Sequence, residues 1–368
     1  MYKIENLDEL FDFVYGCSLF GCGGGGSPSI GTELLTASFK KQSTLTYYDI
    51  DYFDDEDWIC TAFYMGSIAP QSEIEKEKMI GRGQTQRRNE FFLEESILEL
   101  EKELGVTFSA IIAEELGGIN AVAPFAAATN LNKKFIDGDF AGRAVPEATA
   151  IYPRILDLKM CPVACCDVWG NKTIIRESHS YELVEVIGKM LSVPAGEPIG
   201  LAGFAMQIKD AKRALSRNTL SKAQNIGKLL RETDLNKRSF PELFSRIVNG
   251  KWLFSGTVNK MKWKNEDGYM IGNFYLCGIN EFLNHTLKMW FKNENHIAWI
   301  DDIVQVTSPD LIQILDSNSG LPVTNDALTD GQSIDVIAIP NERYRTPAGI
   351  DVLGPHHFGY FDITYQPF

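Results

Sequence analysis

The sequence lacks any long apolar run, which argues against a membrane protein. No stretch of eighteen apolar residues occurs in the 368-residue chain, so no segment is predicted to span a membrane. Its first thirteen residues are acidic and amphipathic and lack the apolar core of a signal peptide. We therefore expect a cytoplasmic protein.

A dense basic stripe is also lacking. The formal net charge is −14, and a nucleic-acid binder needs a basic face to neutralise phosphates. The most basic stretches, 82–88 and 209–231, are typical of solvated helix faces, and the second carries Leu and Ala at helical spacing. We expect no nucleic-acid partner. An anionic small-molecule substrate remains compatible with this charge, because one or two well-placed arginines suffice.

Familiar metal and nucleophile signatures are absent too. The five histidines form no His-x-His or His-Glu-x-x-His pattern, and the seven scattered cysteines lack zinc-knuckle spacing. No Gly-x-Ser-x-Gly elbow occurs. His356 and His357 are adjacent, so on an extended strand they would point to opposite faces, and only one of them, here assigned as His357, could reach a site.

The patterns that are present predict two domains. Residues 1–165 alternate helix and strand, with Asn6 capping a helix over 7–19 and strands at 107–113 and 134–136 flanking a helix at 118–129. Short connections of this kind favour an α/β domain with a mostly parallel sheet. Residues 166–368 contain a few helices and then short strands at 252–263, 269–276, 286–291 and 334–339. This second part is predicted to be a mainly β domain.

Carboxylates gather where two of the predicted parallel strands end. One cluster spans 114–120 and the other 137–147, and ligands bind at the carboxyl ends of such strands. We predict catalytic roles for four carboxylates and binding roles for two neighbours: Glu115, Asp137, Asp139 and Glu147, with Asn120 and Arg143. All six are expected to line one pocket. The alternatives are helix capping for the carboxylates and a structural counter-ion role for Arg143.

The run 21–28 contains five glycines and ends in proline. It follows a helix and lacks a Gly-Lys-Ser/Thr ending, so it is neither a P-loop nor a dinucleotide fingerprint. It is either a flexible turn or a wall of the site in which the backbone approaches a ligand closely. In the second case Gly24 and Gly25 bind substrate, and Cys22 or Ser27 contributes.

Seven motifs together resemble one known family. They lie at 21–28, 65–70, 115–120, 137–147, 291–295, 309–312 and 354–360. The chain resembles the S-methyl thiohydantoin desulfurase family, formerly a domain of unknown function associated with hydantoinase/oxoprolinase proteins. The resemblance implies an N-terminal α/β domain and a mainly β C-terminal domain. It also implies a hydrolase that converts an S-methyl thiohydantoin with a propionate arm to a hydantoin and methanethiol, in breakdown of ergothioneine-type compounds.

Several alternatives stay open at this point. The cofactor is unknown, with zinc as one candidate, because a metal could acidify the attacking water in place of a carboxylate base. The protein could also be a non-catalytic partner subunit of a hydantoinase/oxoprolinase-like enzyme, or a homo-oligomer. An enzyme should have an enclosed pocket lined by the carboxylates and Arg143, whereas a subunit should expose a large apolar patch.

Overall fold

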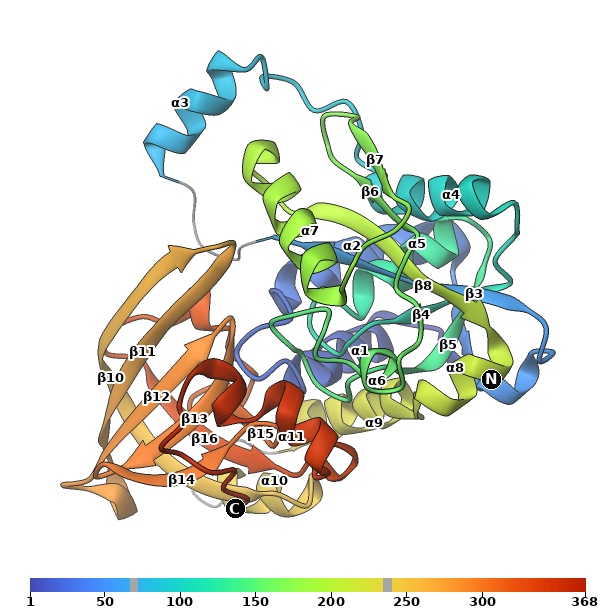
Figure 1. Ribbon diagram of the computed structural model, residues 1–368. Helices are drawn as coiled ribbons and strands as arrows, with labels where there is room; N and C mark the ends of the chain where they lie inside the picture. The colour runs from blue at the N-terminus through green and yellow to red at the C-terminus, as the bar shows by residue number, and fades with distance from the viewer. Residues whose placement is uncertain (67–71, 234–239) are drawn as a thin grey trace.

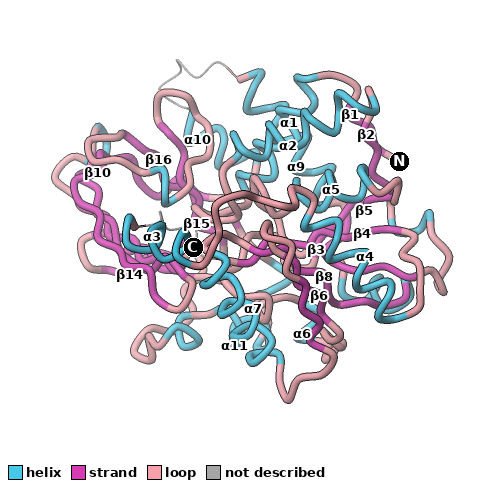
Figure 2. Tube along the Cα trace, turned by 90° about the horizontal axis from the view of Figure 1, so that it is seen from above, coloured by secondary structure: helices cyan, strands magenta, loops and turns pink. Residues whose placement is uncertain are grey.

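The computed structural model describes residues 1–66, 72–233 and 240–368 and contains two β-sheets (Figure 1). Residues 67–70 of the 65–70 motif lie outside the described residues. Seen from above, strands β3, β4 and β5 lie on one side and strands β10 and β14 on the other (Figure 2). Within the described ranges, no helix combines the length and apolarity needed to cross a bilayer.

The first sheet has the strand order β1-β2-β5-β4-β3-β8-β6-β7, with β9 paired to β5. Its strands are β1 (Tyr2–Ile4), β2 (Leu45–Tyr48), β3 (Trp58–Met65), β4 (Ala110–Ala113), β5 (Lys134–Asp139), β6 (Val163–Cys166), β7 (Lys172–Ile175), β8 (Ile199–Gln207) and β9 (Ser216–Arg217). The four central strands β2, β5, β4 and β3 pair in parallel, and the flanking strands pair antiparallel. Strand β4 reads Ala-Ile-Ile-Ala and is wholly buried, as expected where helices cover both faces.

Helices cover both faces of this sheet. One core contains side chains of α1 (Leu7–Leu19), α2 (Pro28–Gln42), α4 (Phe92–Leu104), α5 (Val122–Asn130) and α9 (Thr219–Glu232). The other contains side chains of α6 (Tyr152–Ile155), α7 (Tyr181–Ala195), α8 (Ile208–Ala214) and α11 (Pro347–Leu353). Two further helices are α3 (Glu73–Gly81) and α10 (Phe240–Ile247), and short 3-10 turns lie at Ile50–Tyr52, Asn280–Phe282, Asn325–Ala327, Glu342–Tyr344 and Pro355–Phe358. These helices confirm the predicted α/β domain.

Helices α1 and α9 lie in direct backbone contact. A Cβ at Gly16 would stand 1.8 Å from the carbonyl oxygen of Ala223, and one at Gly227 would stand 1.8 Å from that of Asp12. Only glycine permits this approach. Asn6 caps α1 as the sequence predicts, since its side chain accepts a hydrogen bond from the N–H of Glu9.

The second sheet is antiparallel throughout, in the order β14-β13-β12-β11-β10-β16-β15. Its strands are β10 (Lys251–Glu266), β11 (Tyr269–Gly278), β12 (Thr286–Lys292), β13 (Glu294–Ile300), β14 (Ile303–Thr307), β15 (Leu311–Asp316) and β16 (Ser333–Ile339). The predicted mainly β C-terminal part is confirmed, although β13, β14 and β15 were not predicted individually. Residues 163–217 contribute β6 to β9 to the first sheet, and the second sheet begins at Lys251.

Candidate functional site

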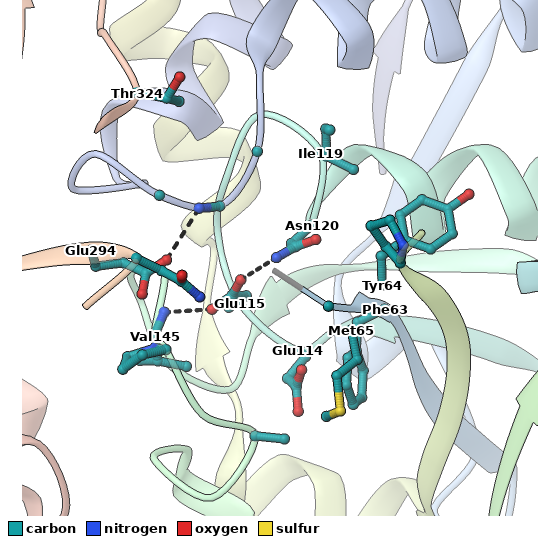
Figure 3. A pocket seen from close by; sticks show the side chains of 18 of the residues that line it. Phe63, Tyr64, Met65, Glu114, Glu115, Ile119, Asn120, Val145, Glu294 and Thr324 are labelled. Atoms are coloured by element: carbon teal, nitrogen blue, oxygen red, sulfur yellow. Dashed lines mark hydrogen bonds between the residues drawn. The ribbon is translucent and has the colours of Figure 1, made fainter. Parts of the chain in front are cut away.

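A cavity of about 330 Å³ is lined by residues from both parts of the chain. The first part supplies the glycine run, the end of β3, and the loops after β4 and β5, and α7 contributes its inner face. The second supplies Asn293 and Glu294 at the β12–β13 turn, together with Thr324 and Asp326. Figure 3 shows Phe63, Tyr64 and Met65 on the opposite side of the site from Glu294, with Glu114 and Glu115 between. The cavity therefore has an apolar wall and a carboxyl-rich wall.

The glycine run forms part of the cavity wall because side chains would collide there. A Cβ at Gly24 would stand 1.9 Å from Oε1 of Glu294, and one at Gly25 would stand 2.8 Å from Cα of Gly117. Gly25 also has a φ of +70°, and its carbonyl accepts a hydrogen bond from the N–H of Ile119. The run thus packs its backbone against the loop after β4. Within the run, Cys22 is buried and lies outside the cavity lining, whereas Ser27 lines the cavity.

Glu114 and Glu115 follow β4 directly, as the sequence predicts for a strand end. Glu115 accepts hydrogen bonds from the Asn120 side-chain amide and from the N–H of Val145. Burial and the nearby Glu294 raise the pKa of Glu115. Glu114 is buried, and its Oε1 has no hydrogen-bond partner among the described residues. Burial, reinforced by the charge of Glu115, raises the pKa of Glu114 well above its usual range, which favours the protonated form of this carboxyl.

Glu294 faces these two residues from the second sheet. Its Oε1 accepts a hydrogen bond of 3.3 Å from the N–H of Gly25, and its Oε2 has no hydrogen-bond partner in the described chain (Figure 3). Burial raises the pKa of Glu294 to about 7, even though the charges of Arg143 and Lys189 oppose the shift. The charge of Glu294 raises the pKa of Glu115, and burial disfavours two charges on the pair. Glu294 was not assigned from the sequence, although it lies inside the 291–295 motif.

Helix α7 buries two charged side chains at the site while it exposes several apolar ones. Its exposed face carries Leu183, Val186 and Met190, whereas Glu185 and Lys189 are buried and line the cavity. Such an inversion is unexpected for a helix that only supports a core. Sequence reasoning missed both residues, because a Glu and a Lys four positions apart usually form an exposed pair.

Asp137 and Asp139 lie outside the cavity lining, contrary to the expectation that both strand ends deliver carboxylates to one pocket. Strand β9 pairs with the end of β5 and covers it, placing Gly138 opposite Arg217. Asp137 accepts hydrogen bonds from the N–H groups of Leu220 and Ser221 at the start of α9. Asp139 accepts from the N–H groups of the turn at 141–142, and burial raises its pKa to about 6. Both carboxylates hold backbone in place.

Arg143 also lies outside the cavity lining, with its side chain fully buried. Its guanidinium donates to four carbonyl oxygens: Ala144 at 2.8 Å, Asp310 at 3.0 Å, Pro309 at 3.1 Å and Asn295 at 3.4 Å. These bonds join the loop after β5 to the second sheet. The pocket position expected for Arg143 is thereby corrected, because its guanidinium lies outside the cavity lining and donates four hydrogen bonds to the protein's own backbone.

Glu147 and His357 lie together, but neither is part of the cavity lining. The ammonium of Lys292 forms an ion pair with Glu147, and Nε2 of His357 lies 2.9 Å from Oε2 of Glu147. Burial favours the protonated form of Glu147, but the hydrogen bond from His357 and the charge of Lys292 outweigh it and lower the pKa of Glu147 to about 2. Of the predicted residues, Gly24, Gly25, Ser27, Glu115 and Asn120 line the cavity.

A zinc site does not fit the residues present. In the described parts of the chain, no three His, Cys, Asp or Glu side chains are arranged to hold a metal ion. The cavity lining contains no histidine or cysteine, the ligands that zinc prefers besides carboxylates. The titratable groups of the lining are the carboxyl groups of Glu114, Glu115, Glu185, Glu294 and Asp326, the ammonium of Lys189 and the phenol of Tyr64.

These observations define a class: a protein with a partly parallel α/β sheet, an antiparallel β-sheet, and a carboxyl-lined cavity to which both contribute. Residues 8–177 match the family model described as "S-Me-THD-like, N-terminal domain", and residues 179–368 match "S-Me-THD-like, C-terminal domain". The chain belongs to the S-Me-THD-like family, which confirms the resemblance seen in its motifs.

A solved structure shares the fold. The crystal structure of a protein from Chromobacterium violaceum is similar over 100% of this chain and 99% of its own, with a TM-score of 0.76 and 20% sequence identity. At this identity the similarity supports the fold and no particular activity. No curated protein matches the sequence.

Proposed function

We propose that the protein is a hydrolase of a small cyclic amide-like ring of the S-methyl thiohydantoin type. In this reaction water replaces the S-methyl group at C2, giving a hydantoin and methanethiol. Membership of the S-Me-THD-like family supports the ring class. Among the cavity residues, Phe63 and Met65 offer an apolar wall for a ring and a methylthio group.

The observation that carries the proposal is the pair of unpartnered carboxyl oxygens in the cavity. Oε1 of Glu114 and Oε2 of Glu294 have no hydrogen-bond partner among the described residues. Burying such groups without partners is costly unless a ligand completes them. Burial raises both pKa values: that of Glu114 well above its usual range, and that of Glu294 to about 7. One group is suited to be an acid and the other a base.

The reaction balances with these two groups. Glu294 takes a proton from water as the water oxygen bonds to C2, and Glu114 gives a proton to the ring nitrogen that receives the C=N electron pair. The hydroxyl of this intermediate then returns a proton to Glu114 as the carbonyl forms. The C–S bond breaks, and the departing sulfur takes the proton from Glu294. Both carboxyls are restored, one water is consumed and one methanethiol leaves.

Glu115 and Asn120 have a supporting role in this scheme. Glu115 accepts hydrogen bonds from Asn120 and from the N–H of Val145, and the charge of the nearby Glu294 raises its pKa. Whenever Glu115 is neutral, Glu294 ionises more easily and can act as the base. The N–H of Gly25 stabilises the same ionised form by donating to Oε1 of Glu294.

The experiment is turnover of an S-methyl thiohydantoin in ¹⁸O-labelled water by the purified protein. We expect one free thiol for each ring converted, with one ¹⁸O atom at C2 of the hydantoin. Thiol release without ¹⁸O incorporation would exclude hydrolysis. Absence of turnover, with activity appearing only when a hydantoinase-like enzyme is added, would favour the alternative of a non-catalytic partner subunit.

A further inference from the structure

Lys189 is a buried cation without a counter-ion in contact. Its side chain belongs to the inner face of α7 and lines the cavity, and the residue is 7% exposed. Within the described residues its Nζ forms no ion pair with a carboxylate, and its hydrogen bonds go to backbone carbonyl oxygens. Nζ reaches only the carbonyl oxygens of Gly66 and Gly268, both at 3.4 Å. An ammonium has three donors, and within the described residues no third oxygen or nitrogen acceptor of Lys189 is found.

Glu185, the neighbouring carboxylate, is occupied by other groups. Its Oε1 accepts a hydrogen bond of 2.9 Å from the Tyr269 hydroxyl, and its Oε2 accepts one of 2.9 Å from the N–H of Ala148. Burial raises the pKa of Glu185 and lowers that of Lys189, so neither charge is fully stabilised by the other. The two residues thus form no closed ion pair.

The stem of Lys189 is fixed in place. Its Nζ lies 4.2 Å from the centre of the Tyr269 ring, and its Cδ would lie 3.0 Å from a Cβ at Gly268. Lys292 lies over the same ring at 4.0 Å, but its ammonium is paired with Glu147. Of these two ammonium groups beside Tyr269, only that of Lys189 is available to a ligand in the cavity.

We propose that Lys189 is the specificity-determining residue that binds an anionic group, a carboxylate, on the substrate. This inference rests on the proposed function and deepens it. It replaces Arg143, which lies outside the cavity lining and donates to backbone carbonyls, as the anchor for an anionic substrate. The carboxylate lies at the α7 side of the cavity, and the reacting ring lies between Glu114 and Glu294.

The test compares two substrates that differ only in charge. Rates are measured for an S-methyl thiohydantoin with a propionate arm and for its propionamide, using the wild type, Lys189→Gln and the exposed control Lys228→Gln. We expect wild type and Lys228→Gln to prefer the acid by about 10- to 100-fold in kcat/KM. Lys189→Gln should lose that factor on the acid while its rate on the amide changes less than about threefold.

Three results would overturn the inference: an acid-to-amide ratio near one in the wild type, an undiminished ratio in Lys189→Gln, or an equal loss on both substrates. If Lys189→Gln does not fold, Lys189→Met is used in its place, because methionine keeps an apolar stem at this position. The acid-to-amide ratio of Lys189→Met is then compared with that of the wild type. If the wild type converts neither compound, the proposed function fails separately. Calorimetry then measures the binding of hydantoin propionate and of its amide to the same proteins. We expect the wild type to bind the acid more tightly and the Lys189 variant to lose this preference. Equal affinities of the wild type for the two compounds would contradict the role of Lys189.

Discussion

The N–H of Gly25 donates a hydrogen bond to Oε1 of Glu294 across 269 positions of sequence. This contact places a backbone amide of the first part of the chain against a carboxyl of the second, at the wall of the cavity. It is one of several contacts that hold the two sheets together there. The N–H of Asn295 donates to the carbonyl of Cys22, and the N–H of Asn325 donates to that of Gly23.

Gly24→Ala should abolish activity. The added Cβ would stand 1.9 Å from Oε1 of Glu294, so the carboxyl must leave its position. We expect kcat/KM to fall at least about 100-fold, because displacing a reacting group by about 1 Å costs this much. The matched control is Gly81→Ala on α3, where a Cβ meets nothing within 4 Å. Equal activity of the two variants would contradict the close approach at Gly24.

Arg143→Lys should impair folding stability more than substrate binding. Lysine keeps the charge but cannot donate to four carbonyl oxygens in the plane of a guanidinium. We expect a loss of about 2–4 kcal/mol in the free energy of unfolding, with KM nearly unchanged. Arg176→Lys, at an exposed ion pair with Glu103, should change stability by less than about 0.5 kcal/mol. A raised KM with an unchanged melting temperature would show that Arg143 binds the substrate after all.

Glu147→Gln should reveal a pH-dependent contribution to stability. The folded-state pKa of Glu147 is about 2, below its ordinary value of 4.5, so its stabilisation is complete above about pH 4.5 and is lost as pH falls toward 2. Glu147→Gln should therefore be less stable than wild type by about 3 kcal/mol at pH 7. The difference should narrow by about 1.4 kcal/mol per pH unit below pH 4.5. Urea unfolding at pH 7 and pH 3.5 measures the difference in unfolding free energy between wild type and variant at each pH. An equal difference at the two pH values would mean that Glu147 is not held ionised by Lys292 and His357.

Part of the site could be predicted from sequence because it depends on local patterns. Glu115 and Asn120 follow an apolar run that ends at Ala113, and strand ends of a parallel sheet gather at one edge. The same rule misplaced Asp137 and Asp139. Strand β9 lies far along the chain and covers the end of β5, and no local sequence pattern predicts this pairing.

The remaining site residues were missed for a related reason. Glu294 begins an antiparallel strand of the second sheet, and its role depends on contact with Gly25, far away in sequence. Lys189 was missed because α7 exposes Leu183, Val186 and Met190 and buries its Glu and Lys pair, which reverses the usual inference from amphipathicity at these positions. The fold class needed only strand and helix periodicity and the family motifs, and both domains were predicted from them.

Replacement of Glu294 by Gln tests the central claim most directly. Glutamine keeps the size and the hydrogen bond from Gly25 but cannot take a proton from water. We expect thiol release from an S-methyl thiohydantoin to fall by about 10²- to 10⁴-fold in Glu294→Gln, with KM little changed and thermal stability retained. The exposed control Glu56→Gln should match the wild type. Thiol release by Glu294→Gln at the wild-type rate would show that another group activates the water and would contradict the account.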